Sequence, residues 1–287
     1  MSFPFKTVGL HARPNNPGIE DLIHQICDWM RARGVQVVSV EGQPSFQGVE
    51  SLPADEYKKR VTMFLVLGGD GTFLGAGRLS LGGNAPILGV NLGRLGFLTE
   101  ITVPELFPVL QRMEDGDVQY EVRHVLHVSV KRDGNILFEG HVINDAVISK
   151  TTIARLLEIE TQVDGNFLAL FKADGLIIAT PTGSTAYSLA AGGPIVFPTM
   201  EAIVMTPICA HSLSQRPLVV PDYLTISVQV LSSAANCALT LDGQSVRSLE
   251  AGEYVAIERS PLQLKVIKSP FMSYFDILKS KLRWAEG

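Results

Sequence analysis

A run of glycines around a single carboxylate is the feature of this sequence that most directly suggests chemistry. Gly68-Gly69-Asp70-Gly71-Thr72 follows Val61–Leu67, an apolar run of strand length without alternation. Such a run predicts a strand buried on both faces of a parallel sheet, and open α/β sheets bind ligands beyond the carboxyl ends of their strands. Glycines let the backbone approach a polyphosphate, and a following helix offers free N–H groups to it. The turn therefore predicts a phosphate site, with Thr72 as the cap of the next helix.

Asp70 is the residue of this turn that requires a chemical explanation. A carboxylate beside bound phosphates is repelled by them unless it binds a metal ion or takes up a proton. The turn is not a Walker A loop, because no Gly-Lys-Ser/Thr follows it. A tight turn without chemistry would use the same residue types. On these residues alone, phosphoryl transfer is a hypothesis.

Two further groups of polar residues are suited to a nucleotide. The pair Asn144-Asp145 combines an amide with a carboxylate, which suits adenine or the two hydroxyls of a ribose. An Asx turn at the end of a strand is the alternative for this pair. The run Thr182–Thr185 offers hydroxyl donors at a turn into a short helix, and Tyr187 can stack on a ring.

Cations and metal ligands give weaker signals. Arg155 and Lys172 are the cations that we place near the phosphates, although such residues are usually solvated surface charges. His124 and His127 are three residues apart in an expected strand, so they would point to opposite faces and would not share a metal ion. We assign no residue as a metal ligand.

Four further stretches, together with the glycine turn, resemble the NAD kinases. They are Asn91–Leu98, Asn144-Asp145, Asp174–Pro194 and Leu241–Gln244, in the family's order and over essentially the whole chain. The block Asp174–Pro194 is the most specific of them. The glycine turn itself is also similar to that of the diacylglycerol and sphingosine lipid kinases and the 6-phosphofructokinases.

The resemblance implies ATP-dependent phosphorylation of the adenosine ribose 2′-hydroxyl of NAD to give NADP, in a homodimer or homotetramer. It implies that Asp70 accepts the proton, that a divalent cation such as Mg²⁺ lies on the phosphates, and that Asp174 meets the nicotinamide side of NAD. The family more often has Glu where this chain has Asp145. The residues that we assign to nucleotide binding, from the resemblance and from their chemistry, are Asp70, Gly71, Asn144, Asp145, Arg155, Lys172, Asp174, Thr185, Ala186, Tyr187, Ser188, Leu189, Ala190 and Gln244.

The elements that must position these residues change character near Tyr120. Before it, strands expected at 5–10, 35–40, 61–67 and 86–90 alternate with helices, as in an α/β domain. Asn16-Pro17 predicts a helix start and Gly34 the end of that helix. Thr102-x-x-Glu105 predicts a further helix through a capping box. Residues 41–59 are expected to form a loop.

Beyond Tyr120, short alternating segments separated by Asp-Gly dipeptides predict antiparallel hairpins. We expect a Rossmann-like α/β domain with a mostly parallel sheet over 1–119 and a mostly-β NAD-binding domain over 120–270. The segment 271–287 is expected to pack back on the first domain through a helix. The strands expected in the second half are 120–130, 136–143, 156–163, 167–171, 224–231, 238–241, 254–257 and 262–267, with a helix at 275–284.

Composition excludes several classes of protein. A chain of 287 residues with 46% hydrophobic residues is not intrinsically disordered, and a formal net charge of −5 argues against a general nucleic-acid binder. No apolar run of about 18 residues predicts a membrane span, and the first residues show no secretory signal. Cys27, Cys209 and Cys237 suit buried free thiols in a reducing compartment, so we expect a cytoplasmic protein.

Three alternatives to an NAD kinase can be weighed from the sequence. A lipid kinase would need an apolar or basic membrane-facing surface, and a 6-phosphofructokinase is not supported because the chain has no Thr-Ile-Asp-Asn-Asp stretch. A non-catalytic pyridine-nucleotide sensor would keep the nucleotide site without turnover. Formation of NADP from NAD and ATP distinguishes the kinase from all of these.

Overall fold

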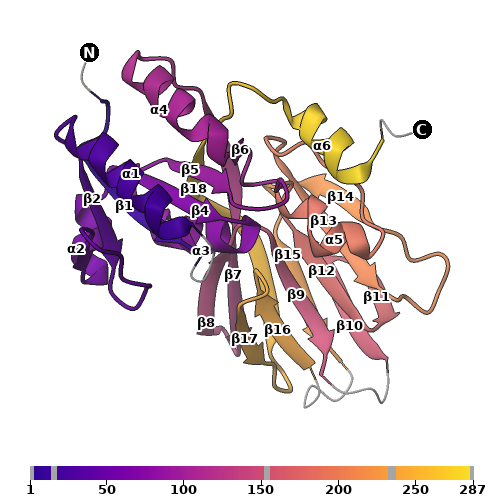
Figure 1. Cartoon of the computed structure of the whole chain (residues 1–287). Coiled ribbons are helices and arrows are strands. Elements are labelled where there is room, and N and C mark those ends of the chain that lie inside the picture. The colour runs from indigo at the N-terminus through magenta and orange to yellow at the C-terminus, as the bar shows by residue number, and fades with distance from the viewer. Residues whose placement is uncertain (1–2, 14–17, 152–155, 232–236, 285–287) are drawn as a thin grey trace. The chain divides into compact units, whose positions relative to one another are not determined.

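The computed structural model describes residues 3–13, 18–151, 156–231 and 237–284 (Figure 1). Its internal contacts divide the chain into two compact units, Met1–Val122 with Leu264–Gly287, and Arg123–Gln263. We call the first the α/β unit and the second the β unit. The expected fold class is confirmed: a parallel α/β sheet in the N-terminal part, a mostly-β part after it, and a final helix that belongs to the α/β unit. No helix in the described part of the chain is long and apolar enough to cross a membrane.

The α/β unit is built on a parallel sheet in the order β5-β4-β1-β2-β3. At its centre, every residue of β4 is buried, as the unbroken apolar sequence predicts. The short β6 and the end of β18 both pair with β5 in parallel. The strands are β1 (Thr7–Ala12), β2 (Gln36–Val40), β3 (Glu50–Leu52), β4 (Met63–Gly68), β5 (Ile87–Asn91), β6 (Ile101–Thr102) and β18 (Tyr254–Ile267).

Helices cover both faces of this parallel sheet. On one face, α1 (Ile19–Arg31) and α4 (Leu106–Glu114) share an apolar core with alternate residues of β1 and β4. On the other face lie α2 (Ala54–Arg60) and α3 (Asp70–Ser80). The aromatic side chains of Tyr57 on α2 and Phe73 on α3 pack closely on the sheet. A Cβ on Gly9 would collide with Tyr57, and a Cβ on Gly89 would collide with Phe73. Helices thus cover the parallel sheet on both faces.

Helix ends in this unit agree with the sequence only in part. The backbone of Gly34 has φ 70° and follows the end of α1 as expected, whereas Asn16-Pro17 lies outside the described residues. Thr102 and Glu105 form the expected capping box, at the start of a 3₁₀ turn (Val103–Glu105) that leads into α4. Thr72 is not the cap of α3, because that helix already begins at Asp70. The expected loop at 41–59 is wrong where it contains β3 and α2.

The β unit contains antiparallel strands in two sheets. One joins β11-β10-β15-β18, with β7 paired to β18 and β8, and the other has the order β14-β13-β12-β9-β16-β17. The strands are β7 (Tyr120–Arg132), β8 (Asn135–Val142), β9 (Asp145–Lys150), β10 (Leu157–Val163), β11 (Asn166–Ala173), β12 (Gly175–Ala179), β13 (Ala202–Ile208), β14 (Leu218–Pro221), β15 (Ile226–Val230), β16 (Cys237–Leu241) and β17 (Ser245–Ser248).

Both faces of the central strands of the six-stranded sheet, β9, β12, β13 and β16, are mostly buried. One face meets the other sheet in a core that includes Ile148, Leu176 and Met205. The opposite face presents Ile177 and Val204 to a second core that includes Val196. Between β12 and β13, the chain forms a 3₁₀ turn (Gly183–Thr185) and α5 (Tyr187–Ala190), as the sequence predicts for this stretch.

The three Asp-Gly hairpins are confirmed. Asp133, Asp164 and Asp242 each have φ near 50°, and the glycine that follows each of them also has positive φ. Other expectations for this half of the chain are wrong. The two strands expected at 254–257 and 262–267 are one continuous strand, β18, and β9, β12, β13, β14 and β17 were not expected.

The remaining elements concern the C-terminus and the cysteines. The expected helix is α6 (Tyr274–Leu282), capped by Ser273, which accepts a hydrogen bond from the backbone N–H of Asp276. Cys27 and Cys237 are buried free thiols, but Cys209 is exposed, which corrects the expectation for that residue. Cys209 follows the end of β13 in a positive-φ conformation, so it lies in a turn rather than in the core.

Candidate functional site

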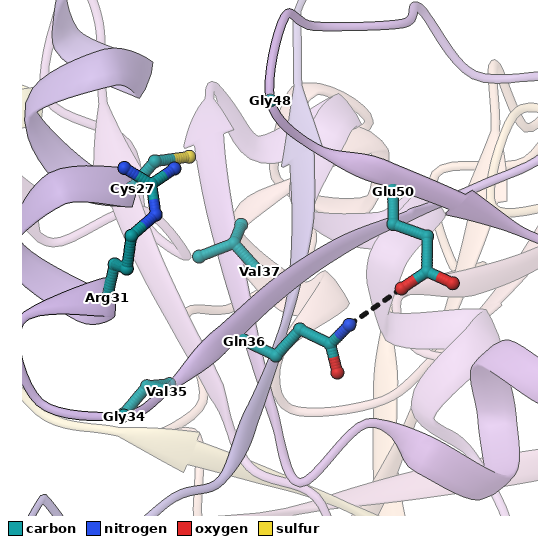
Figure 2. Close-up of a pocket in the computed structure, with 8 residues that line it drawn as sticks. All are labelled: Cys27, Arg31, Gly34, Val35, Gln36, Val37, Gly48 and Glu50. Atoms are coloured by element: carbon teal, nitrogen blue, oxygen red, sulfur yellow. Dashed lines mark hydrogen bonds between the residues drawn. The ribbon is translucent and has the colours of Figure 1, made fainter.

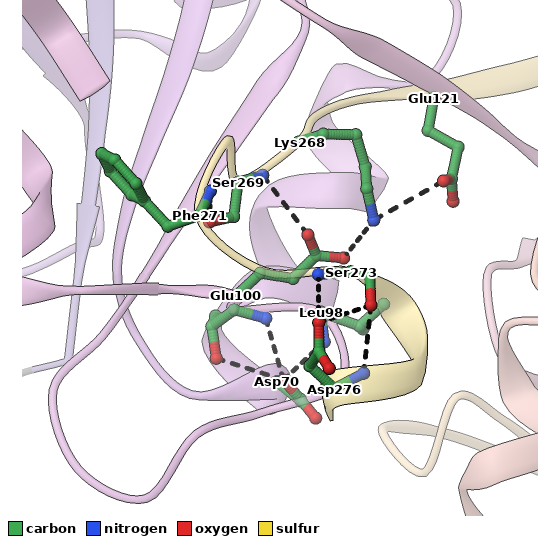
Figure 3. Close-up of polar contacts among 10 residues, drawn as sticks. Asp70, Leu98, Glu100, Glu121, Lys268, Ser269, Phe271, Ser273 and Asp276 are labelled. Atoms are coloured by element: carbon green, nitrogen blue, oxygen red, sulfur yellow. Dashed lines mark hydrogen bonds and ion pairs between the residues drawn. The ribbon is translucent and has the colours of Figure 1, made fainter. Parts of the chain in front are cut away.

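Asp70 is held by a set of converging hydrogen-bond donors (Figure 3). It is the first residue of α3, directly beyond the carboxyl end of β4. Its Oδ1 accepts from the backbone N–H groups of Leu98 (3.0 Å) and Thr99 (3.2 Å) and from the Thr99 hydroxyl (3.2 Å). Its Oδ2 accepts from the backbone N–H of Phe97 at 2.9 Å. We call residues 97–99 the clasp. It fixes the carboxylate while leaving Oδ2 with one partner among the described residues.

The local sequence explains why the clasp can approach so closely. Gly96 precedes it, and a Cβ at this position would collide with Oδ1 of Asp70 and with the Thr99 hydroxyl. The side chain of Asn91, at the end of β5, donates to the Thr99 hydroxyl at 2.8 Å and accepts from the backbone N–H of Gly93 at 2.7 Å. The stretch Asn91–Leu98, recognised in the sequence, is therefore the segment that builds the clasp.

In the β unit, Asn144 and Asp145 lie at the start of β9, under a second carboxyl group. Asp242, from the hairpin between β16 and β17, accepts from the backbone N–H groups of Ile143 (3.1 Å), Asn144 (2.7 Å) and Asp145 (3.2 Å). The side-chain Oδ1 of Asn144 is buried without a hydrogen-bond partner among the described residues. An unpaired buried acceptor is unfavourable, so this atom is available to a donor on a ligand.

Burial perturbs the titration of Asp145. Only 5% of this residue is exposed. Burial first, and the neighbouring Asp242 carboxyl second, raise the pKa of Asp145 from 3.8 to about 7. Near neutral pH, both forms of Asp145 are therefore populated: a protonated form that can donate a hydrogen bond and an ionised form that only accepts.

The predicted residues from Thr185 to Ala190 differ in accessibility. Tyr187 is 47% exposed, which leaves its ring available for stacking. Ser188 is fully buried, and its hydroxyl lies 2.8 Å from that of Thr206 in β13, so its side chain faces the sheet. Before this segment, a Cβ on Gly183 would collide with the backbone of Asn144, which brings the turn against the start of β9. The exposed or partly exposed members are Thr185, Ala186, Tyr187, Leu189 and Ala190.

Two predicted charged residues of the β unit have partners within the unit. Lys172 on β11 lies 2.9 Å from Glu158 on the neighbouring β10, and both side chains are about half exposed. Asp174 lies 2.5 Å from the ammonium group of Lys150, a partner that sequence reasoning did not identify. Gln244 is exposed, at the hairpin that also holds Asp242. Arg155 lies outside the described residues.

The predicted residues thus divide between the two units. Asp70 and the exposed Gly71 belong to the α/β unit, and the others named above belong to the β unit. A cavity of about 320 Å³ elsewhere in the α/β unit contains none of the predicted residues (Figure 2). Its lining residues are Cys27, Arg31, Gly34, Val35, Gln36, Val37, Gly48 and Glu50.

Comparison with known proteins identifies the family. A family model described as the ATP-NAD kinase N-terminal domain matches residues 8–118, and one described as the C-terminal domain matches residues 143–269. The chain belongs to the ATP-NAD kinase family. The reaction of this family is the ATP-dependent phosphorylation of NAD, so the chain is a transferase. The match to both family domains excludes the lipid-kinase and 6-phosphofructokinase alternatives.

Individual relatives agree with this assignment over nearly the full length. An NAD kinase from Solibacter usitatus is 41% identical over 98% of both chains, and one from Geobacter sulfurreducens is 42% identical over 98% of this chain and 99% of its own. Among solved structures, a yeast NADH kinase complexed with NADH aligns with a TM-score of 0.90 at 26% identity, covering 99% of this chain and 89% of that one. An NAD kinase from Archaeoglobus fulgidus in complex with ATP aligns with a TM-score of 0.74 at 25% identity, covering 96% and 98%.

The residues that the structure describes do not form a metal cage by themselves. No group of three or more His, Cys, Asp or Glu side chains that could hold a metal ion occurs among the described residues. A magnesium ion commonly takes few protein ligands and binds mainly to substrate phosphates and water. Among the described residues, the donor set therefore fits a metal that arrives with ATP better than a metal held by the protein alone.

Sequence reasoning missed two parts of the site. The donors to Asp70 are mostly peptide N–H groups, which carry no side-chain signal, although the stretch that contains them was recognised. Asp242 was noted as part of a motif without a role, and the structure shows it bound to three successive N–H groups beside Asp145. The Asp-Gly hairpin, which places that carboxyl in a sharp turn, is the sequence signal for it.

Proposed function

We propose that this chain transfers the γ-phosphoryl group of ATP to the 2′-hydroxyl of the adenosine ribose of NAD, giving NADP and ADP, with Asp70 as the proton acceptor. The observation that carries the proposal is the clasped Asp70 carboxylate, which combines fixed geometry with an oxygen, Oδ2, that has one partner among the described residues. The relatives whose structures contain NADH and ATP support both substrates.

The chemical step follows from this geometry. The ribose oxygen forms a bond to the γ-phosphorus, the bond from that phosphorus to the β,γ-bridging oxygen breaks, and ADP leaves. The hydroxyl proton passes to Oδ2 of Asp70. Because transition states of phosphoryl transfer are largely loose, the main contributions of the protein are positioning and neutralisation of charge, and a weak base is sufficient.

Recognition of NAD is assigned to the β unit. The unpaired Oδ1 of Asn144 can accept from an amino group, and the carboxyl of Asp145 can bind ribose hydroxyls. Tyr187 offers an exposed ring for stacking. Thr185, Ala186, Leu189, Ala190 and Gln244 supply the remaining accessible positions, and Lys172 and Arg155 are proposed to face phosphates. Asp174, paired with Lys150, is proposed for the nicotinamide side.

We treat the divalent cation as part of the ATP substrate. MgATP brings the metal on its phosphate oxygens, and that ion neutralises phosphate charge when bound. The proposal also includes a cytoplasmic location and assembly into a homodimer or homotetramer. Light scattering after size-exclusion chromatography tests the assembly.

The test is the substitution Asp70→Asn. It keeps the size of the side chain but removes the proton acceptor, so kcat for NADP formation is expected to fall by about 10²- to 10⁴-fold. The dissociation constant for NAD, measured by calorimetry, is expected to change less than about twofold, because NAD recognition is assigned to the other unit. As a control, Asp28→Asn alters an exposed carboxylate of α1 that contacts Arg31, and it is expected to keep full turnover.

Two results would remove this proposal. Retained turnover in the Asp70→Asn variant would exclude Asp70 as the proton acceptor. If the unmodified protein binds NAD but forms no NADP from NAD and MgATP, the chain is a pyridine-nucleotide sensor.

A further inference from the structure

The clasp that holds Asp70 is followed by a buried charge. Glu100 comes directly after Thr99, and only 3% of it is exposed. Its Oε1 lies 2.7 Å from Nζ of Lys268, and its Oε2 accepts from the backbone N–H of Ser269 at 3.4 Å (Figure 3). We infer that Glu100 and Lys268 are positioning residues for Asp70, because their ion pair fixes the backbone whose N–H groups hold the carboxylate. This inference rests on the proposed role of Asp70.

The direction of the clasp donors depends on the backbone at both ends of residues 97–99. Each peptide group is planar, so a shift of one Cα atom turns the N–H groups beside it. Gly96, just before the clasp, donates its N–H to the carbonyl of Thr99 at 3.3 Å and so joins the two ends of the segment, and Asn91 holds the Thr99 hydroxyl. At the C-terminal end, the side chain of Glu100 supplies the corresponding anchor. The clasp is therefore fixed at both ends.

The anchor itself is well held. The ammonium group of Lys268 lies 3.5 Å from Glu121 as well as 2.7 Å from Glu100, and the side chain of Lys268 is only 15% exposed. The backbone N–H of Lys268 donates to the carbonyl of Gln119 at 3.0 Å. From α6, the ammonium group of Lys281 lies 5.6 Å from the ring of Phe97 in the clasp. The end of β18 and the segment after it therefore support the clasp from one side.

Holding a loop with a buried ion pair has a high cost in desolvation free energy. Apolar side chains of similar volume often stabilise a protein as well or better, because two charges lose their hydration on burial. A charged pair adds direction, since the carboxylate of Glu100 must meet both the ammonium of Lys268 and the N–H of Ser269. Such directional contacts fix the position of Glu100, and with it the backbone of the clasp that orients Asp70.

The experiment combines substitutions at both positions with kinetics. In Glu100→Gln, kcat is expected to fall at least tenfold while KM for NAD and for ATP changes less than twofold. In the Asp70→Asn background, the same substitution is expected to change residual turnover less than twofold, because that variant has no carboxylate at position 70 for the clasp to orient. An equal loss in both backgrounds, or an unchanged kcat in folded Glu100→Gln, would overturn the inference.

A double variant separates positioning from stability. Glu100→Gln removes the nearer partner of the mostly buried ammonium group of Lys268 and leaves it only the longer 3.5 Å contact with Glu121, so it is expected to lower the melting temperature. Adding Lys268→Met removes that charge, and the melting temperature is expected to recover in part while kcat stays at least tenfold low. If kcat recovers together with the melting temperature, the ion pair is merely structural and the inference fails.

A matched control uses another ion pair of the same unit. Glu114 lies 2.9 Å from Arg33, and its side chain is 15% exposed. Glu114→Gln is expected to lower the melting temperature and to leave kcat unchanged, and a loss of kcat here would overturn the interpretation of Glu100. Failure of the proposed function is distinguishable, because it shows as retained turnover in Asp70→Asn alone, whatever Glu100→Gln does.

Discussion

The buried carboxyl of Asp145 makes the stability of the β unit depend on pH. Its pKa is raised to about 7 in the folded chain, mainly by burial and then by the neighbouring Asp242, against 3.8 for the ordinary group. Because the folded state holds this proton more tightly than the unfolded state, the contribution of Asp145 is most favourable below pH 4. It is lost progressively as pH rises to 7. Above pH 7 the folded protein carries the full cost of a buried charge.

The size of this effect follows from the shift of the pKa. A difference of roughly 3 units corresponds to about 4 kcal/mol over the whole range, at 1.36 kcal/mol for each unit. Between pH 5 and pH 8, linkage gives a loss of roughly 2 to 3 kcal/mol in the free energy of unfolding. Asn has nearly the same shape and does not ionise. The variant Asp145→Asn is therefore expected to gain that amount on the wild-type protein over this interval.

The assay is urea denaturation of both proteins at pH 5, 6, 7 and 8 without nucleotide, followed by a signal from the β unit. The difference in unfolding free energy between Asp145→Asn and wild type is expected to shift steadily toward the variant as pH rises. Asp133→Asn is the control, because it alters an exposed hairpin residue with φ 50°, a conformation that Asn also adopts. Its curve is expected to follow the wild type. Parallel curves for wild type and Asp145→Asn would refute the reasoning.

Two further substitutions test other parts of the α/β unit. Gly96→Ala places a Cβ against Oδ1 of Asp70 and the Thr99 hydroxyl, so it is expected to displace the clasp and to lower kcat by roughly 10- to 100-fold, measured as NADP formation. An unchanged kcat would show that the clasp does not control Asp70. Tyr57→Phe removes the buried hydroxyl that lies 2.7 Å from Nε2 of His11, whose pKa is lowered to about 4 by burial. We expect a loss of about 1–3 kcal/mol in unfolding free energy with turnover unchanged, and equal stability by urea denaturation would contradict this.

The sequence predicts those elements whose pattern is set locally. The continuous apolar run of β4, the capping box of Thr102 and the Asp-Gly hairpins were all predictable, because each depends on neighbouring residues. The helix α2 was not, since Tyr57 is its one buried residue and gives no amphipathic repeat. Ser260 and Pro261 divide the sequence of β18 into two expected strands, yet the structure continues through them. Strand pairing over long separations overrides such local signals.

The candidate site shows the same division. Asp70 could be singled out because its glycine neighbours mark an unusual backbone, and Asn144-Asp145 because an amide beside a carboxyl is suited to a nucleotide. The ion pair of Glu100 with Lys268 joins residues 168 positions apart, and only the fold brings them together. The same is true of Asp145 and Asp242, whose proximity contributes to the raised pKa of Asp145.

The clasp has a consequence for how variants of this chain should be interpreted. Three of its four donors belong to the main chain, so exchanging the side chains of Phe97 or Leu98 leaves those donors in place. Only proline lacks the N–H group and would delete a donor outright. Tolerance of many residue types at these two positions would therefore not show that they are dispensable. A proline scan through 97–99 would reveal a requirement that an alanine scan passes over.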